Sequence, residues 1–215
     1  PTVGNHVFTM VTNWHGAPGA TGITSSDNQS NTWATDKVIR HSINFLTITG
    51  AIASAKVATS SGTFTITIAP STASANYIEA VAVEFSGLAT TSWLDQTGSA
   101  EGSNDGANAA NVTAAGANSQ NDMLVIASGG FLASSTNIHV GVPTTGYTER
   151  GVYQNVNDTI GYESATKIIS GAETSAAAWT HDNLGNNLGW LAVIATYKAA
   201  AAAAALRRVG RRGVF

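Results

Sequence analysis

Acidic side chains are the first candidates for chemistry in this sequence, because two facing carboxyl groups can cleave a glycosidic bond. Glu79 and Glu84 lie five positions apart in an apolar stretch that is predicted to be a β-strand. Side chains alternate along a strand, so these two glutamates point to opposite faces. A glycosidase needs carboxyl groups about 5–10 Å apart across a cleft. The spacing therefore predicts no catalytic residues, and a glycan-degrading enzyme is the weakest functional hypothesis.

Transition-metal and nucleotide sites have little support in the sequence. The chain has no cysteine, which excludes thiolate ligands and disulfides. No G-x-S-x-G turn, Walker A loop or G-x-G-x-x-G follows a predicted strand, and Gly129–Gly130 is predicted to be a turn. The histidines show no pair at the spacing of metal ligands; they are His6, His15, His41, His139 and His181. The sequence thus predicts a protein that is not an enzyme.

Two turn segments are rich enough in oxygen ligands to consider calcium. One combines Asp27 and Asn28 with Asp36, and the other is Asn104–Asp105. Calcium is a hard cation that prefers oxygen ligands. Neither segment approaches the D-x-[DN]-x-[DN]-G pattern, and Asx residues are also favoured in turns that bind no metal. We therefore predict no cofactor and keep calcium as an alternative.

Aromatic side chains beside loops are candidates for binding a sugar or a neighbouring subunit. Trp14 precedes a loop that begins at His15, and Trp93 precedes Leu94. Aromatic rings stack on flat ligands and are enriched at protein interfaces. Trp190 lies inside an apolar run and is assigned to the core. Trp14 and Trp93 are therefore the predicted contacts for a surface glycan or for another subunit.

The composition indicates architecture rather than catalysis. Apolar residues make up 43% of the 215-residue chain, which is enough for a large core, while charged residues make up only 11%. The usual charged share is about 25%, so the surface must be built from Ser, Thr, Asn and Gly. Such a surface is typical of proteins in extracellular or virion assemblies. No apolar run approaches the ~20 residues that span a bilayer, and no membrane partner is predicted.

Residues 199–215 form an Ala-rich spacer followed by a basic and apolar tail. Four of the ten basic residues lie in this tail, which leaves six against 13 acidic residues in the remainder of the chain. An acidic body with a basic tail suits binding to another copy or to an acidic neighbour. Nucleic acid is the weaker alternative, because no aromatic platform separates the arginines. A frayed end is the other alternative. The expected assembly contacts are Arg207, Arg208, Arg211, Arg212, Val214 and Phe215.

Period-two alternation and turn residues predict a chain made of strands. In residues 63–68, Phe64, Ile66 and Ile68 share one face, while residues 77–85 are apolar on both faces and are predicted to be central in a sheet. Residues 97–120 are predicted to be a long surface loop with at most one exposed strand around Val112. The other predicted strands are 6–14, one that begins at Trp33, 43–48, 53–59, 122–128, 137–142, 146–153, 159–169 and 189–198.

Two segments of the sequence resemble two later segments, a similarity that we call the internal echo. Residues 5–12 resemble 121–128 at an offset of 116, and residues 78–85 resemble 190–197 at an offset of 112. Repeats that preserve core strands and vary their loops give this pattern. The echo predicts one β-sandwich, residues 1–198, built from two similar halves, about 5–96 and 121–198. Residues 97–120 join the halves.

With the strands placed, three motifs can be compared with known families. They are Asp27-Asn28-Gln29-Ser30-Asn31-Thr32-Trp33, Val83-Glu84-Phe85-Ser86-Gly87 with Leu94-Asp95, and Trp190-Leu191-Ala192-Val193-Ile194-Ala195-Thr196-Tyr197-Lys198. In these motifs the chain resembles the jelly-roll, lectin-like β-sandwiches of phage structural proteins and secreted bacterial proteins. The resemblance covers roughly residues 5–198, and it departs at Gln29 and Ser30, where the similar turns often have glycine. It implies a non-enzymatic surface module without catalytic residues.

These observations predict an all-β, jelly-roll-like antiparallel β-sandwich with an Ala-rich C-terminal tail. The expected function is a structural subunit at a virion surface or in an extracellular assembly, such as a capsid decoration protein or a fibre module. Its expected partners are other protein subunits, including copies of itself. A secreted carbohydrate-binding or adhesive module is the alternative.

Overall fold

The computed structural model describes residues 1–15, 22–43, 46–71, 77–103, 109–120, 122–133, 146–154, 160–171, 173–180, 187–201 and 207–208. All regular elements in these ranges are strands. Within the same ranges, no helix has the length and apolar character needed to cross a membrane. The strands are β1 (His6–His15), β2 (Ile23–Asp27), β3 (Trp33–Ile43), β4 (Leu46–Lys56), β5 (Ile66–Pro70), β6 (Tyr77–Ser86), β7 (Leu94–Ser103), β8 (Ala109–Thr113), β9 (Asp122–Ala133), β10 (Thr148–Gln154), β11 (Ile160–Ser170), β12 (Ala176–Thr180), β13 (Asn187–Lys198) and β14 (Arg207–Arg208).

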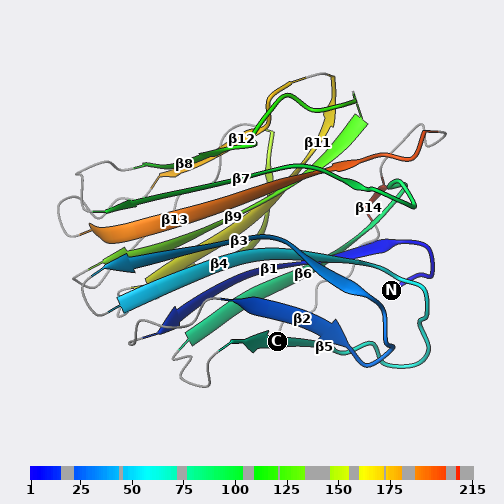
Figure 1. Cartoon of the computed structure of the whole chain (residues 1–215), viewed down its shortest axis with the longest axis horizontal. Coiled ribbons are helices and arrows are strands. Elements are labelled where there is room, and N and C mark those ends of the chain that lie inside the picture. Colours follow the sequence, from blue (N-terminus) through cyan, green and yellow to red (C-terminus); the bar gives the residue numbers. More distant parts are fainter. Residues whose placement is uncertain are drawn as a thin grey trace.

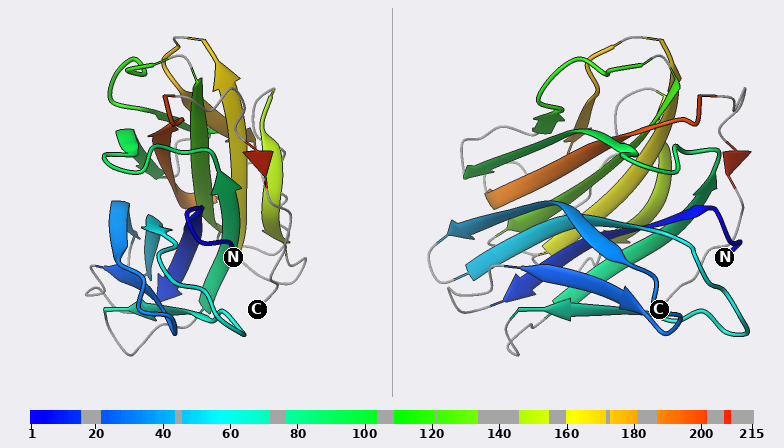
Figure 2. Two further views of the ribbon diagram at one scale, coloured as in Figure 1. Left: turned by 90° about the vertical axis from the view of Figure 1, so that its right-hand side faces the viewer. Right: turned by 45° about the vertical axis from the view of Figure 1, so that its right-hand side comes forward.

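Two five-stranded antiparallel sheets pack against each other in a sandwich-like arrangement. The first sheet has the order β14-β6-β1-β4-β3, and the second has the order β10-β11-β9-β13-β7. Each sheet is covered on its outer side by a two-stranded sheet, β2–β5 on the first and β8–β12 on the second. Figure 1 shows β8 and β12 at the top and β2 and β5 at the bottom, and Figure 2 shows the same layers from two other directions. The all-β prediction is confirmed.

The core between the two large sheets comes from alternate residues of their central strands. Phe8 and Met10 of β1 pack against Leu124 and Ile126 of β9, together with Tyr197 of β13. All five side chains are fully buried. Every residue of β1 is buried, because the opposite face of that strand lies under β2 and β5. A continuous apolar run is therefore expected for β1 and β9, rather than apolar and polar alternation.

Glycines inside strands allow the two sheets to approach closely. A Cβ at Gly130 of β9 would lie 2.6 Å from Cγ2 of Thr12, and a Cβ at Gly50 of β4 would lie 2.5 Å from Cδ1 of Leu191. Neither distance is compatible with a real side chain. The prediction that Gly129–Gly130 forms a turn is wrong, because both residues lie within β9. Glycine occupies these positions because the facing sheet leaves no room for a side chain, and not because the chain turns there.

The strand β6 is not central, contrary to prediction. Among the described residues, its one long neighbour is β1, since β14 pairs only with Ser86 and Phe85 there. Most of its residues are half-buried, and Tyr77 and Ile78 are exposed. An edge strand packed on one side explains apolar residues on both faces without complete burial.

The segment predicted as a loop at 97–120 contains two strands. β7 pairs with β13 along Gly189–Tyr197, and β8 pairs with β12. Val112 of β8 is not exposed; its side chain is buried between the β8–β12 layer and the second sheet. The predicted strand at 43–48 joins the last residue of β3 to the first residues of β4, and the predicted strand at 53–59 covers only the last part of β4, which ends at Lys56. In β5, Ile66 and Ile68 share a half-buried face as predicted. The predicted strand at 137–142 lies outside the described residues.

Candidate functional site

The edge of β6 is the place where the predicted assembly tail meets the body. Ala199 forms a bridge with Leu88, and the N–H of Ala200 donates to the carbonyl of Gly87 at 2.8 Å. The chain then returns to the same edge, where Arg207 and Arg208 pair with Ser86 and Phe85. The backbone of these two arginines is therefore placed on β6. The other predicted contact residues, Arg211, Arg212, Val214 and Phe215, lie outside the described residues.

The remainder of the β6 edge, from Tyr77 to Glu84, pairs with no strand in the described part of the chain. Its pairing with β1 is regular over the whole length, with no bulge. The outer strands β3 and β10 differ, because each contains a bulge, between Thr35 and Lys37 and between Glu149 and Gly151. Bulges and charged residues protect sheet edges from pairing with other chains. β6 is thus a long, regular edge without a bulge.

The two tryptophans predicted to contact a ligand are both turned inward. Trp14 is only 4% exposed and packs with Ile48, Leu132 and Leu191 between the sheets. Its ring is therefore not exposed for the predicted contact with a glycan or a subunit. Trp93 is partly buried, and its Nε1 donates to Oγ of Ser54 at 3.1 Å. A tryptophan next to a loop proved to be a core residue because both sheets close over it.

Trp93 belongs to an interior polar network that joins the two sheets at one end. Ser54 also hydrogen-bonds to Asp36, whose carboxyl Oδ2 accepts a hydrogen bond of 2.7 Å from the hydroxyl of Tyr197. Burial raises the pKa of Asp36, and these two hydrogen bonds oppose the shift. The His6 ring packs edge-on against Trp93 with 4.9 Å between centroids. Burial and nearby Lys56 lower the pKa of His6 to about 4, so at neutral pH it acts as an uncharged aromatic group.

The predicted calcium ligands have other roles where they are described. Asp27 accepts backbone hydrogen bonds from Gln29 and Asn31 through Oδ1 and an indole hydrogen bond from Trp33 through Oδ2. These donors lower the pKa of Asp27, as expected for an Asx turn. Asp36 bonds to Tyr197 instead. In the described part of the chain, no three His, Asp or Glu side chains converge as metal ligands would. Asn104–Asp105 lies outside the described residues.

The carboxylates of β6 lie on opposite faces, as predicted. Glu79 lies across from Thr12 and Glu84 across from Val7, two positions of opposite parity on β1. Glu84 Oε1 accepts hydrogen bonds from the backbone N–H of Thr2 and from the side chain of Asn5, each at 2.7 Å. This glutamate fastens the N-terminal residues to the edge strand. The two carboxyl groups therefore do not face each other across a site.

Sequence reasoning missed a buried carboxyl group at Glu163. This side chain on β11 is fully buried, and neither carboxyl oxygen has a hydrogen-bond partner among the described residues. Burial, with a contribution from Glu149, raises its pKa to about 8. The side chains of Asn13, His15 and Thr49 are likewise buried, and within the same ranges they have no hydrogen-bond partner. The sequence signal for Glu163 was an acidic residue within a predicted strand, where it is the one acidic residue of β11.

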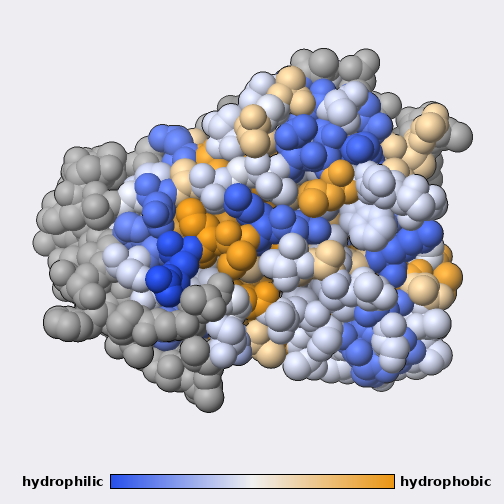
Figure 3. Space-filling model, viewed as in Figure 1, coloured by the Kyte–Doolittle hydropathy of each residue, from blue (hydrophilic) through white to orange (hydrophobic). Residues whose placement is uncertain are grey.

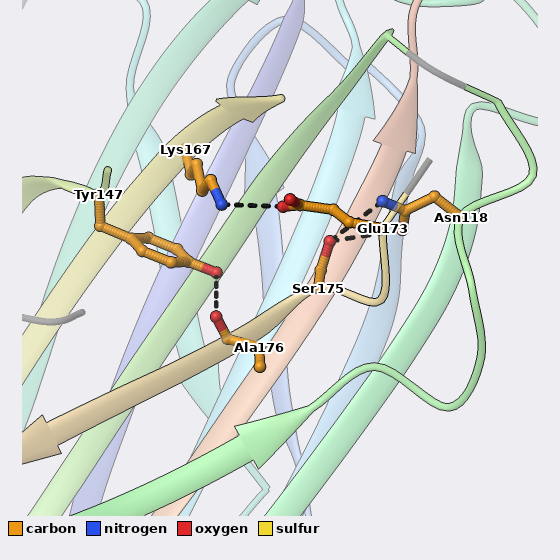
Figure 4. A network of polar contacts seen from close by, with 6 residues as sticks. All are labelled: Asn118, Tyr147, Lys167, Glu173, Ser175 and Ala176. Carbon is orange, nitrogen blue, oxygen red and sulfur yellow. Dashed lines mark hydrogen bonds and ion pairs between the residues drawn. The ribbon is translucent and has the colours of Figure 1, made fainter. Parts of the chain in front are cut away.

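The outer β8–β12 layer is fastened to the second sheet by polar contacts, shown in Figure 4. The hydroxyl of Tyr147 donates to the carbonyl of Ala176 at 2.9 Å, and Lys167 pairs with Glu173 at 2.8 Å. Farther along the same edge, the amide Nδ2 of Asn118 donates to Oγ of Ser175 at 3.2 Å. Because the polar groups in this network bind to each other, we assign them a structural role.

The surface seen in Figure 3 carries apolar patches among hydrophilic residues, including one in the region where Figure 1 shows β3 next to β13. Val38 of β3 is among the exposed apolar side chains. At the same seam, His41 of β3 and Glu101 of β7 form a contact of 3.1 Å between the two sheets. Comparison of the chain with protein-family models, with curated proteins and with solved structures gave no match.

Proposed function

We propose that this protein is a non-enzymatic structural subunit of a virion surface or an extracellular assembly, and that it docks to neighbouring subunits through its C-terminal arm. The observation that carries the proposal is the pairing of β14 with the edge of β6. An arm that leaves the body and adds a strand to a sheet edge is a recurrent mode of protein association. The partners are protein subunits, foremost other copies of this chain.

The surface chemistry supports assembly more than ligand binding. Each of the five tryptophans is buried or partly buried, so no exposed indole offers a stacking platform for a sugar. Charged residues are 11% of the chain. Low charge reduces the repulsion between like-charged copies and the cost of removing ions from water on contact. These features favour the assembly hypothesis over a carbohydrate-binding module.

We also infer that the sandwich consists of two similar halves. In support, β1 is flanked by β4 and β6, and β9 is flanked by β11 and β13, which are the echoed strands and their neighbours. Next to β4 and β11 lie β3 and β10, whose bulges fall at Asp36 and Arg150, the same offset of 114 that separates Leu46–Lys56 from Ile160–Ser170. The pairing of β9 with β13 differs from the equivalent pairing by two residues, which keeps each side chain on its face.

The consecutive placement of β1–β6 in one half and β9–β13 in the other supports the two-half interpretation more directly than the jelly-roll one. The jelly-roll topology of the resemblance stays a prediction.

The assembly function is tested by removing the arm while keeping the contacts at its base. Since Ala199 and Ala200 bond to the loop at Gly87–Leu88, the deletion should begin at residue 201. We expect the full chain to form a multimer in light scattering and negative-stain micrographs, and the variant that lacks residues 201–215 to be a folded monomer by circular dichroism and mass. A full chain that is monomeric at every concentration would refute the function, and equal assembly by the deletion variant would refute the role of the arm.

A further inference from the structure

The two halves differ in how completely one equivalent edge is covered. In the second sheet, the outer edge of β13 is paired with the long strand β7 over Gly189–Tyr197. At the offset of 112, these residues of β13 correspond to Tyr77–Phe85 of β6. In the first sheet, the same edge carries only Arg207 and Arg208. β7 runs antiparallel to β13, and β14 runs antiparallel to β6. The short β14 therefore lies at the start of the position that a longer strand equivalent to β7 would occupy.

We infer that the edge of β6 is the receptor for a full strand formed by residues 207–215 of a second copy of this chain. The inference rests on the assembly function proposed above and names the surface that the arm occupies. Within one chain, Arg207 and Arg208 make the same contact with that chain's own β6. Exchange of an identical element between copies is a low-cost route to oligomers, because it reuses contacts that the monomer already makes.

The register of β14 fits the free edge. Arg207 pairs with Ser86 and Arg208 with Phe85. Continued without a shift, the register brings Val209 opposite Glu84 and Phe215 opposite Ile78. The arm sequence therefore extends along the edge almost to its exposed end at Tyr77, as far as β7 extends along β13.

Side chains of the arm match those of the edge in this register. Phe215 would cover Ile78, which is 39% exposed. Arg211 would lie diagonally across from Glu84, and Arg212 diagonally across from Glu79. Long side chains on diagonal positions of an antiparallel pair reach each other. In this register, Phe215 has an apolar neighbour on β6, and Arg211 and Arg212 have acidic neighbours there.

The spacer is long enough to reach another subunit. Residues 201–206 separate the last contact of the body at Ala200 from Arg207. Six residues extend to about 20 Å at 3.3 Å per residue. Within one chain this length must loop back to Ser86, next to the starting point at Gly87. The same length drawn straight delivers the arm to the edge of an adjacent copy.

Disulfide trapping in the full chain tests both the register and the source of the arm, because the protein has no cysteine of its own. Single variants Val81→Cys and Ala82→Cys on β6 are mixed with Arg212→Cys and Arg211→Cys on the arm. In-register mixtures, 81 with 212 and 82 with 211, should form heterodimers under mild oxidation. The mixtures 81 with 211 and 82 with 212 place the cysteines on opposite faces and serve as matched controls. We expect at least tenfold more linked product from the in-register mixtures, identified by mass spectrometry of the joined peptides.

Each outcome decides the inference. Equal linking in all four mixtures would overturn the register. If the double variant Val81→Cys/Arg212→Cys links only within its own chain and the mixtures do not link, the occupant is the chain's own arm and the second-copy source is overturned. A wild-type chain that forms multimers while no pair links would retain the assembly function and overturn the assignment to β6. A wild-type monomer would overturn both.

Discussion

The hydroxyl of Tyr197 donates a 2.7 Å hydrogen bond to Oδ2 of Asp36, and this contact connects β13 of one large sheet with the bulge of β3 in the other. Tyr197 is fully buried and Asp36 is half-buried. The bulge turns Asp36 toward the second sheet, since an extra residue on one strand re-aims its side chain. An edge irregularity therefore serves as a polar link between the layers.

Replacement of Tyr197 by Phe should destabilise the protein by about 1–3 kcal/mol, because the carboxyl of Asp36 would lose a donor in a buried setting. The loss should also raise the pKa of Asp36 further, since the Tyr197 hydrogen bond opposes the upward shift caused by burial. The cost should shrink as pH falls and Asp36 becomes neutral. Urea unfolding at several pH values measures the effect. The control is Tyr77→Phe at an exposed position, and an equal loss in that variant would contradict the assignment.

Glu163 should make the protein less stable as the pH rises. Its pKa is about 8 in the folded state against 4.5 for the ordinary group, so between these values the folded state holds a proton that the unfolded state has lost. Stability is then fully present below pH 4.5, falls by roughly 1.4 kcal/mol per pH unit up to about pH 8, and is level above it. Chemical unfolding from pH 4 to 9 measures this slope. Glu163→Gln should remove it, and an unchanged slope in that variant would assign the effect to another group.

Ser30 should be replaceable by glycine with a gain in stability. The turn after β2 holds Ser30 at a φ of 60°, in the left-handed region where a side chain costs about 1–2 kcal/mol. Its side chain is exposed. Ser30→Gly should therefore add up to about 1 kcal/mol, less the entropy that glycine gains in the unfolded chain. A higher melting temperature checks this outcome, whereas Ser30→Val should lower it, and the reverse order would refute strain at this position.

Gly130 should not tolerate even one added methyl group. A Cβ there would lie 2.6 Å from Cγ2 of Thr12 and 3.3 Å from Cγ2 of Ile48 in the facing sheet. Overpacking of this kind costs about 1–3 kcal/mol. Denaturant unfolding of Gly130→Ala measures the cost. The matched control is Gly22→Ala, where the nearest atom lies at 3.9 Å and little change is expected. Similar losses in both variants would show that the cost comes from the backbone and not from the contact between sheets.

The long strands β1, β6, β9 and β13 were predictable from sequence, because each contains a run of apolar residues, and the offsets of 116 and 112 were found in this way. The central strands β9 and β13 are apolar because both of their faces are buried, whereas the edge strand β6 leaves most of its residues half-buried. β7 was missed for the opposite reason. It consists largely of Gly, Ser, Thr and Ala, and it is a strand because β13 offers it a partner. A pairing that depends on a distant strand leaves no local signal.

The candidate site residues also divide into those that the local sequence pointed out and those that depend on distant parts of the chain. The arm stood out in the sequence because arginines and apolar residues follow a run of alanines. Two of its residues, Arg207 and Arg208, pair with β6, and its role in assembly stays a prediction. Trp14 and Glu163 were misjudged or missed, since their environments depend on how the sheets stack and not on their neighbours in sequence. Trp14 lies under Leu132 and Leu191 of the opposite sheet, and Glu163 is buried on β11 of the second sheet without a hydrogen-bond partner among the described residues.

The outer β2–β5 and β8–β12 layers have a consequence for how this protein can evolve. They cover the faces of both large sheets, so the β6 edge offers main-chain N–H and C=O groups to a partner. Contacts made by the main chain do not depend on side-chain identity. In the proposed assembly, exposed positions can therefore change among Ser, Thr, Asn and Gly without loss of the main-chain contacts. Changes that bend or shorten β6, such as an inserted proline, are the ones that selection would remove.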